Sequence, residues 1–434
     1  MHLTRRLLLL LPLTAAVPLA AQLPKATPEA AGLSSARLRR IRPMLDSAVA
    51  AGEVTGVLTL LARNGLLVEL DSAGYADREA GTPMRSNTLF RLASMTKAVT
   101  SAAAMMLVEE GKLLLSDPVS RYIPAFRQMR VAMPGADSGK PMTYERATRR
   151  ITIRDLLTHR SGLAYGFGDD GPVGDGYRAA GISDGIARPD MSTMAENVDR
   201  LARQPLLFQP GTRWNYALNT DVLGRVVEVV SGKSLAEFMQ ERIFAPLGMH
   251  ETAFWVPDAR AGRLVVPYMP DSVGKLVPMR AETQSFSEGR LMLAGAASHG
   301  SRTFFSGGAG LVGTGGDYLR FLQMLSNGGE LDGVRLLSRK TVELMTASHT
   351  GDLTGDPLGP GNGFGLGFQV LLDPGTAGEY GSPGTYSWGG IYGTTFWVDP
   401  QEHLVGVMML QRFPTTGIRL RELFRALTYA ALVK

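Results

Sequence analysis

Two short apolar runs between residues 57 and 70 have a strand-like pattern, and from residue 94 the pattern becomes helix-like. Apolar runs at 57–62 and 66–70 flank Asn64-Gly65, a pair typical of a tight hairpin turn, which predicts two paired strands. Between 94 and 110 the chain is rich in Ala, Met and Leu, apolar almost all round and followed by Gly111. This pattern predicts a buried helix directly after the first β structure.

The middle of the chain is mainly helical in pattern. Further helices are expected at 152–159, 218–230 and 234–243. Thr152 and Asp155 have the spacing of a capping box at the start of the first of these helices. The segment from Gly166 to Gly185 is rich in Gly and Asp, so we expect a long loop there that borders a pocket.

Strand patterns return in the last third of the chain. They lie at 364–372, 386–388, 394–398 and 404–411, before an amphipathic helical pattern at 418–433. This order of strands, helices and strands predicts two lobes. Residues 22–124 and 296–434 would form an α/β lobe from both ends of the chain, and 125–295 a mainly helical lobe.

Composition and charge exclude several classes of protein. The 434 residues are 44% hydrophobic and 20% charged, which is typical of a globular protein with a large core. The chain has no cysteine, so disulfides, thiolate metal sites and cysteine nucleophiles are excluded. The formal charge is +5, or 5 − 2 = +3 without Arg5 and Arg6, and no long basic run occurs. Nucleic acid is therefore not an expected partner.

The first 21 residues have the layout of a secretory signal. Met1 to Arg6 is short and basic, Leu7 to Ala21 is almost entirely apolar, and polar chain resumes at Gln22. The apolar stretch is short for a membrane span and contains prolines, so we expect cleavage, a periplasmic or secreted protein and no stable membrane insertion.

Other apparent motifs fail on spacing or context. Gly232-Lys233-Ser234 lacks the first glycine of a phosphate-binding loop, and the G-x-G-x-x-G run at 308–313 lacks a surrounding βαβ unit. No histidine pair has zinc-ligand spacing, and His159, beside a helix stop, is interpreted as structural. No G-x-S-x-G elbow occurs. We therefore expect neither a metal nor a cofactor.

A serine and a lysine lie one helical turn apart at the start of the predicted buried helix. In Ser94-Met95-Thr96-Lys97 both side chains project from one helix face, where the amine can take the hydroxyl proton. Ser272-Val273-Gly274-Lys275 has the same spacing but lies among turn residues, so its two side chains have no fixed register. The tetrapeptide alone supports a catalytic pair and an ordinary polar first turn equally.

Five ordered segments resemble serine hydrolases of the class C β-lactamase type. They are 90–97 with 107–119, 153–163, Gly211 to Gly224, 308–321, and Trp388-Gly389-Gly390. The resemblance spans about residues 28 to 430 and implies an α/β (α+β) fold of the β-lactamase and penicillin-binding-protein type. In that fold an antiparallel sheet is flanked by helices, beside a mainly helical lobe.

The resemblance also implies roles for particular residues. Ser94 would be the acylated nucleophile, Lys97 would orient and deprotonate it, and Tyr216 would shuttle the proton, either of the last two being the formal base. The backbone N–H groups of Ser94 and Ile391 would form the oxyanion hole. Trp388, Gly389 and Gly390 would line the substrate-binding strand.

Two departures from the lactamase pattern indicate the substrate class. Trp388 stands where lactamases carry a lysine that helps to hold the substrate carboxylate, and Leu218 replaces an asparagine two residues after Tyr216. Asn219 is displaced by one position, about 100° around a helix. Both changes resemble the carboxylesterase branch of the family, the family VIII esterases.

We therefore expect an exported serine carboxylesterase whose partner is a small-molecule ester. A β-lactamase or D-amino peptide hydrolase is the alternative within this enzyme class. A catalytically silent protein that binds acyl or cell-wall ligands is the alternative from another class, and labelling of Ser94 by a serine probe separates it from both enzymes. Acyl transfer to other alcohols, the acyl preference and the oligomeric state stay open.

Overall fold

The computed structural model describes residues 22–133, 142–167, 171–185, 193–279, 284–286, 291–293, 299–353 and 358–434. An eight-stranded sheet has the order β14-β15-β16-β17-β18-β1-β2-β3, with every neighbouring pair antiparallel. Its strands are β1 (Gly56–Arg63), β2 (Leu66–Asp77), β3 (Thr82–Pro83), β14 (Asn362–Phe364), β15 (Gln369–Leu371), β16 (Tyr386–Gly389), β17 (Thr395–Asp399) and β18 (Leu404–Leu410).

The centre of this sheet joins the two ends of the sequence. Val57 of β1 pairs with Leu410 of β18, and the pairing continues to Arg63 and Leu404. Both strands are buried along their whole length, so each presents apolar side chains to both faces of the sheet. The predicted α/β fold with an antiparallel sheet is confirmed, whereas the exact lobe boundaries stay a prediction.

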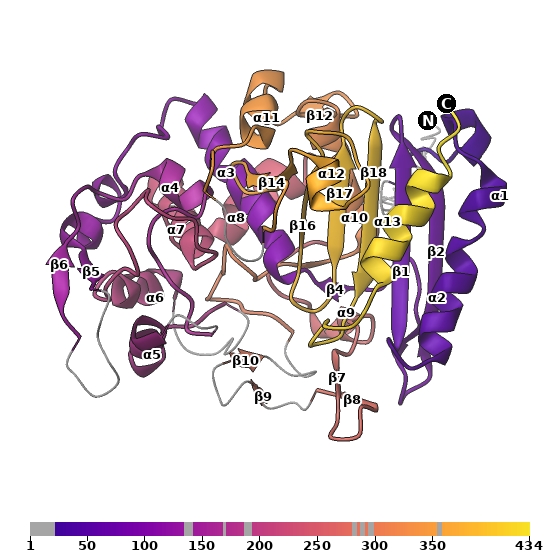
Figure 1. Cartoon of the computed structure of the whole chain (residues 1–434), viewed down its shortest axis with the longest axis horizontal. Coiled ribbons are helices and arrows are strands. Elements are labelled where there is room, and N and C mark those ends of the chain that lie inside the picture. The colour runs from indigo at the N-terminus through magenta and orange to yellow at the C-terminus, as the bar shows by residue number, and fades with distance from the viewer. Residues whose placement is uncertain are drawn as a thin grey trace, which may run out of the picture.

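Helices cover both faces of the sheet (Figure 1). On one face, α2 (Ile41–Ala50) packs against β2, and α13 (Leu420–Ala430) packs against α2 and α1 (Ser35–Leu38). On the other face, α10 (Gly315–Ser326) lies against β18 and β1, and α3 (Thr96–Glu109) packs against α7 (Asn219–Ser231). The buried helix expected at 94–110 is thus α3, which begins after a 3₁₀ turn at Ala93–Met95.

The remaining helices are α4 (Ile153–Leu157), α5 (Gly171–Ala179), α6 (Met194–Leu201), α8 (Leu235–Met239), α9 (Asp258–Ala261), α11 (Arg339–Thr346) and α12 (Pro374–Ala377). Of these, α4, α5 and α6 lie away from the sheet, to the left in Figure 1, whereas α12 lies in front of the sheet. Short two-stranded pairs join β4 (Phe90–Arg91) to β11 (Val312–Gly313), β5 (Arg130–Ala132) to β6 (Tyr144–Arg146), β7 (Tyr268–Pro270) to β8 (Leu276–Pro278), β9 (Gln284–Phe286) to β10 (Leu291–Leu293), and β12 (Glu330–Leu331) to β13 (Val334–Arg335). The capping box expected from Thr152 to Asp155 is present at α4.

Two predictions of local structure were wrong. The segment 166–185 is not one long loop, because it contains α5, where Val173 and Tyr177 lie one turn apart and are both buried. The strand expected at 364–372 is a hairpin of two strands, β14 and β15. Gly367 reverses the chain there with φ of 99°, so close to α3 that an added Cβ would lie 2.2 Å from the Ser101 hydroxyl.

A buried carboxyl group lies on the face of the sheet that α2 covers. Oε1 of Glu69 accepts a hydrogen bond from the Thr59 hydroxyl (2.9 Å), and Oε2 is inaccessible to solvent and has no hydrogen-bond partner among the described residues. Burial raises the pKa of Glu69 from its ordinary 4.5 to about 8, and the hydrogen bond from Thr59 opposes this rise. The carboxyl group is therefore protonated in the folded protein at neutral pH.

We expect the stability of the protein to fall as the pH rises from 5 to 8. The unfolded carboxyl ionises near pH 4.5 while the folded one keeps its proton up to about pH 8, so its stabilising contribution is lost as the pH rises through this window. Glu69→Gln mimics the protonated group and should remove about 3 to 4 kcal/mol of this dependence between pH 5 and pH 8. Urea unfolding of both proteins at pH 5 and at pH 8 measures how the free energy of unfolding changes with pH. An equal change in Glu69→Gln and in the unmodified protein would contradict the prediction.

Candidate functional site

Ser94 and Lys97 lie at the start of α3, and their side chains meet. Nζ of Lys97 donates hydrogen bonds to Oγ of Ser94 (3.2 Å) and to the carbonyl oxygen of Gly308 (2.8 Å). Lys97 is only 2% exposed, whereas Ser94 lines a cavity. Ala93, directly before the serine, has φ of 46°, a left-handed backbone that a residue with a Cβ adopts at some cost. The strain is stored beside a partly exposed hydroxyl whose partner amine is buried.

Tyr216 packs directly over the lysine. Nζ of Lys97 lies 4.6 Å from the centroid of the Tyr216 ring, and the Trp388 indole donates a hydrogen bond from Nε1 to Oη of Tyr216 (3.3 Å). Both contacts place positive charge or a hydrogen-bond donor against the phenol. They hold the phenol beside the Lys97 amine, where it can take part in proton transfer.

His159 supports Tyr216 from behind. Its ring centroid lies 4.9 Å from that of Tyr216, and Nδ1 accepts a hydrogen bond from the backbone N–H of Ala217 and contacts Nδ2 of Asn219 (2.9 Å). Burial, and then the charge of Lys97, lowers the pKa of His159 well below its ordinary value, so the ring is neutral. His159 is thus structural, as expected, and Asn219 is engaged with it.

Asp221 on α7 is a buried acid that the sequence analysis missed. Its Oδ1 accepts hydrogen bonds from Oγ of Ser306 (2.6 Å) and from N–H of Gly308 (3.3 Å), the residue whose carbonyl oxygen holds Lys97. Oδ2 has no partner among the described residues. Burial raises the pKa of Asp221, and the charge of Lys97 opposes that rise. Asp221 therefore fixes the loop that orients the lysine.

The turn after β16 approaches the serine from the sheet. At Gly390 an added Cβ would lie 2.6 Å from the carbonyl oxygen of Leu92 and 2.3 Å from Oγ1 of Thr394, so only glycine permits this close approach. Ile391 follows it in a turn that closes with hydrogen bonds from N–H of Gly390 to Thr394 O and from N–H of Gly393 to Gly390 O. The turn thus lies against the segment that carries Ser94.

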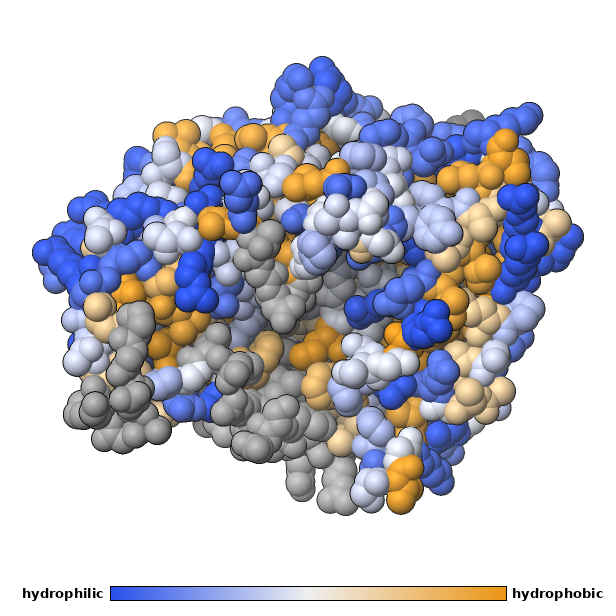
Figure 2. All heavy atoms as spheres, in the orientation of Figure 1, coloured by the Kyte–Doolittle hydropathy of each residue, from blue (hydrophilic) through white to orange (hydrophobic). Residues whose placement is uncertain are grey.

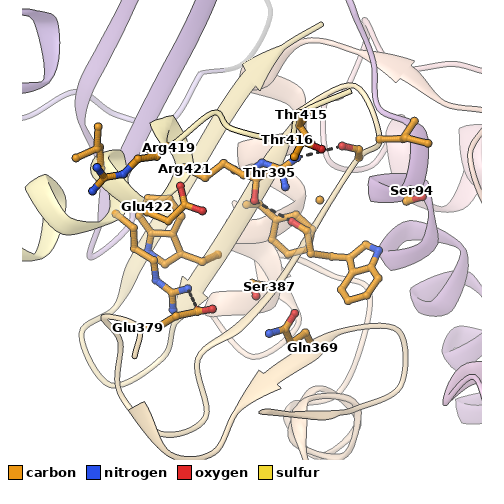
Figure 3. A pocket seen from close by; sticks show the side chains of 18 of the residues that line it. Ser94, Gln369, Glu379, Ser387, Thr395, Thr415, Thr416, Arg419, Arg421 and Glu422 are labelled. Atoms are coloured by element: carbon orange, nitrogen blue, oxygen red, sulfur yellow. Dashed lines mark hydrogen bonds and ion pairs between the residues drawn. The ribbon is translucent and has the colours of Figure 1, made fainter. Parts of the chain in front are cut away.

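A cavity of about 690 Å³ contains these groups. Ser94, Tyr216, Trp388, Gly389, Gly390 and Ile391 line it together with aromatic side chains such as Phe167 and Phe413. In Figure 3, Ser94 lies at one end, while Glu379, Arg419 and Glu422 lie toward the other. Figure 2 shows this face of the molecule hollowed near its middle, with hydrophobic residues at the edge of the hollow.

The structure thus brings together every residue expected at the site. Of these residues, Lys97 does not line the cavity, because it lies behind Ser94. The second serine and lysine, Ser272 and Lys275, lie in a turn held by the Asp271 side chain. The glycine run at 308–313 packs beside α7, where an added Cβ on Gly308 would lie 2.5 Å from Asp221. The run thus belongs to the loop whose carbonyl group at Gly308 contacts Lys97.

In the described ranges, His, Asp and Glu form no group of three or more that could hold a metal ion. Nor does any helix within these ranges have the length and apolar character needed to cross a membrane. The signal expected at residues 1–21 lies outside the described residues.

Comparisons with known proteins agree with this geometry. The profile of the Beta-lactamase family matches residues 41–430. Protein Rv1367c of Mycobacterium tuberculosis is 37% identical over 378 residues, which cover 85% of this chain and 88% of the relative. Esterase EstB of Burkholderia gladioli is 37% identical over 384 residues, covering 86% and 90%.

A solved structure shares the whole architecture. EstCE1, described as a hydrolase with promiscuous acyltransferase activity, is 33% identical and superposes with a TM-score of 0.77. The match covers 91% of this chain and 98% of the EstCE1 chain. Sequence and structure therefore point to the same group of proteins.

Proposed function

The chain belongs to the beta-lactamase family of serine hydrolases, and from that premise we propose that it is a carboxylesterase that works through an acyl-enzyme on Ser94. One observation carries the proposal. Ser94, Lys97 and Tyr216 meet at a cavity whose wall beside Tyr216 is the indole of Trp388. Two of the relatives, EstB and the lovastatin esterase of Penicillium rubens, are named as esterases.

In the proposed acylation, Oγ of Ser94 attacks the ester carbonyl carbon and its proton passes to the pair formed by Lys97 and Tyr216. Lys97 contacts both Oγ of Ser94 and the ring of Tyr216, so the pair spans the nucleophile and the cavity. The N–H groups of Ser94 and Ile391 receive the negative carbonyl oxygen. The intermediate then expels the alkoxide, which takes its proton from Tyr216.

Deacylation repeats these steps with water in place of the serine. Water loses a proton to the same pair, its oxygen attacks the acyl carbon, and Oγ of Ser94 leaves and recovers the proton. An alcohol in place of water would give acyl transfer. The aromatic wall of Trp388, Phe167 and Phe413 suits an apolar acyl or alcohol group.

The preference for esters over lactams follows from the cations of the cavity. Trp388 occupies the position of the lysine that holds the carboxylate of a lactam. The guanidinium of Arg425 is paired with Glu379 (2.7 Å), and that of Arg421 donates to main-chain carbonyl groups. Arg419 lies toward the end of the cavity away from Ser94 (Figure 3). A neutral ester needs no cation, whereas an anionic lactam loses a charge-assisted hydrogen bond worth about 1.5 to 3 kcal/mol.

We expect kcat/KM for a short-chain p-nitrophenyl ester to exceed that for a penicillin or a cephalosporin by at least about a hundredfold. Loss of the charge-assisted hydrogen bond to the lactam carboxylate alone lowers kcat/KM for the lactam tenfold to more than a hundredfold, at about 1.4 kcal/mol per tenfold change. Spectrophotometric assays of one purified preparation with both substrates measure the ratio. Equal or faster turnover of the lactam would instead support a β-lactamase or D-amino peptide hydrolase.

We also propose that the protein is exported and that residues 1–21 are removed. The support is the basic start, the apolar stretch and the polar restart at Gln22. The intact mass of protein recovered outside the cytoplasm tests this, since a chain that retains Met1 there would argue against cleavage.

A further inference from the structure

Arg421, in the first turn of α13, reaches the back of the turn that carries Ile391. Its Nη2 donates hydrogen bonds to the carbonyl oxygens of Gly390 (3.2 Å) and Thr394 (3.3 Å), and its Nε donates to that of Gly393 (3.3 Å). One side chain therefore holds three carbonyl groups of a single five-residue segment. In Figure 3, Arg421 lies between Thr395 and Arg419, on the sheet side of the cavity.

The contact with Gly390 has a direct consequence for Ile391. The carbonyl group of Gly390 and the N–H of Ile391 belong to one peptide unit, which is planar and trans, so they point in opposite directions. The Gly390 oxygen is held by Arg421 and also by N–H of Gly393 (2.9 Å). The N–H of Ile391 is consequently turned away from Arg421.

The positive charge also changes the strength of this N–H group as a donor. A cation that donates to a carbonyl oxygen polarises the whole peptide unit, which strengthens the N–H at its other end. No carboxylate lies within ion-pair distance of Arg421 in the described ranges, unlike Arg425 and Arg63, which pair with Glu379 and Glu402. The hydrogen bonds of the guanidinium thus all go to the turn, and Glu422, next to Arg421 in the chain, is the acidic residue whose charge also acts on it.

We propose that Arg421 is a positioning residue of the oxyanion hole, which orients and polarises the peptide unit of Gly390 and Ile391 from behind. This inference rests on the proposed function, because it assigns Ile391 N–H to the developing oxyanion. Arg421 itself touches no reacting atom. It acts in the transition state through the peptide, so it should affect kcat more than KM.

Arg421→Gln and Arg421→Lys test the role. We expect Arg421→Gln to lower kcat for a p-nitrophenyl ester about 10- to 100-fold, less than the 10²- to 10³-fold loss of a whole oxyanion donor, with KM within about threefold. Arg421→Lys should be intermediate, because an ammonium group supplies the charge without the planar fork. Unchanged kcat in Arg421→Gln would overturn the proposal.

A thionoester separates positioning from a general loss of structure. Sulfur is a larger and weaker hydrogen-bond acceptor than oxygen, so a well-aligned hole favours the oxygen ester over its thiono analogue. We expect this preference to fall about tenfold in Arg421→Gln. Arg320→Gln is the matched control: Arg320 on α10 also donates to a main-chain carbonyl, that of Leu247 (2.6 Å), but does not line the cavity. The Arg320→Gln variant should have a lower Tm, but its kcat and its preference for the oxygen ester over the thionoester should be unchanged.

The test also distinguishes failure of this inference from failure of the proposed function. Ester turnover by the unmodified enzyme tests the proposed function. The ratio of kcat in Arg421→Gln to kcat in the unmodified enzyme tests the role of Arg421. If the enzyme does not turn over esters, the rate at which a p-nitrophenyl phosphonate labels Ser94 can be compared between the two proteins instead. In this reaction negative charge develops on the phosphoryl oxygen, which lies in the same oxyanion hole. Equal labelling rates in Arg421→Gln and the unmodified enzyme would then reject the inference alone.

Discussion

Replacing Ser94 by alanine is expected to lower kcat for ester hydrolysis by about 10⁴- to 10⁶-fold, because it removes the cavity hydroxyl that contacts the Lys97 amine and would form the acyl-enzyme. Ser94 is the hydroxyl that Lys97 contacts and that faces the cavity. The side chain is small and partly exposed, so the folded protein should keep its Tm. Turnover is measured with a p-nitrophenyl ester, with a serine-reactive fluorophosphonate probe as the second readout.

Ser272→Ala is the matched control for this variant. Ser272 and Lys275 repeat the spacing of Ser94 and Lys97, but they lie in the turn between β7 and β8 rather than on a helix. We expect full activity and unchanged labelling in Ser272→Ala. Loss of activity in this variant and not in Ser94→Ala would refute the assignment of the nucleophile, and an inactive parent protein that binds acyl ligands would support the binding-protein alternative.

Tyr216→Phe should lower kcat by about 10³-fold, within the range of a lost general acid–base group. The phenyl ring keeps the packing on His159 and the contact with Nζ of Lys97, so the change removes Oη with its hydrogen bonds with Trp388 and Tyr165. Both acylation and deacylation pass a proton through this oxygen. Pre-steady-state measurements with a p-nitrophenyl ester should therefore show both steps slowed.

Tyr122→Phe is a suitable control for this second variant. The Tyr122 hydroxyl also donates a partly buried hydrogen bond, to Asp117 (2.6 Å), but Tyr122 does not line the cavity. It should alter stability and leave both kinetic steps unchanged. If Tyr216→Phe retained more than about a tenth of kcat, Lys97 alone would be the proton carrier.

Local patterns in the sequence predicted much of the fold. The hairpin at Asn64-Gly65, the capping box at Thr152 and the buried helix after Ser94 depend on neighbouring residues, and each is present. The helix α5 was missed because a Gly- and Asp-rich composition disfavours helix, while burial of Val173 and Tyr177 stabilises it. Tertiary packing decided the structure there.

The candidate site was predictable only in part, for a similar reason. Ser94 and Lys97 belong to one helical turn, and Tyr216 lies in a segment that resembles the family. Asp221 and Arg421 act through loops 87 and 31 residues away in the sequence, where no local pattern connects the partners. Such contacts follow from the three-dimensional arrangement alone.

The pairing of β1 with β18 makes the order of synthesis important for this protein. A ribosome releases Ser94 and α3 about 300 residues before β18 and α13, yet the turn of Ile391 and its arginine also come from the last part of the chain. Contacts over such separations form slowly, because a long loop must close first. The nascent chain therefore carries its serine and lysine without the rest of the site, and esterase activity should appear only after the C-terminal helix has docked.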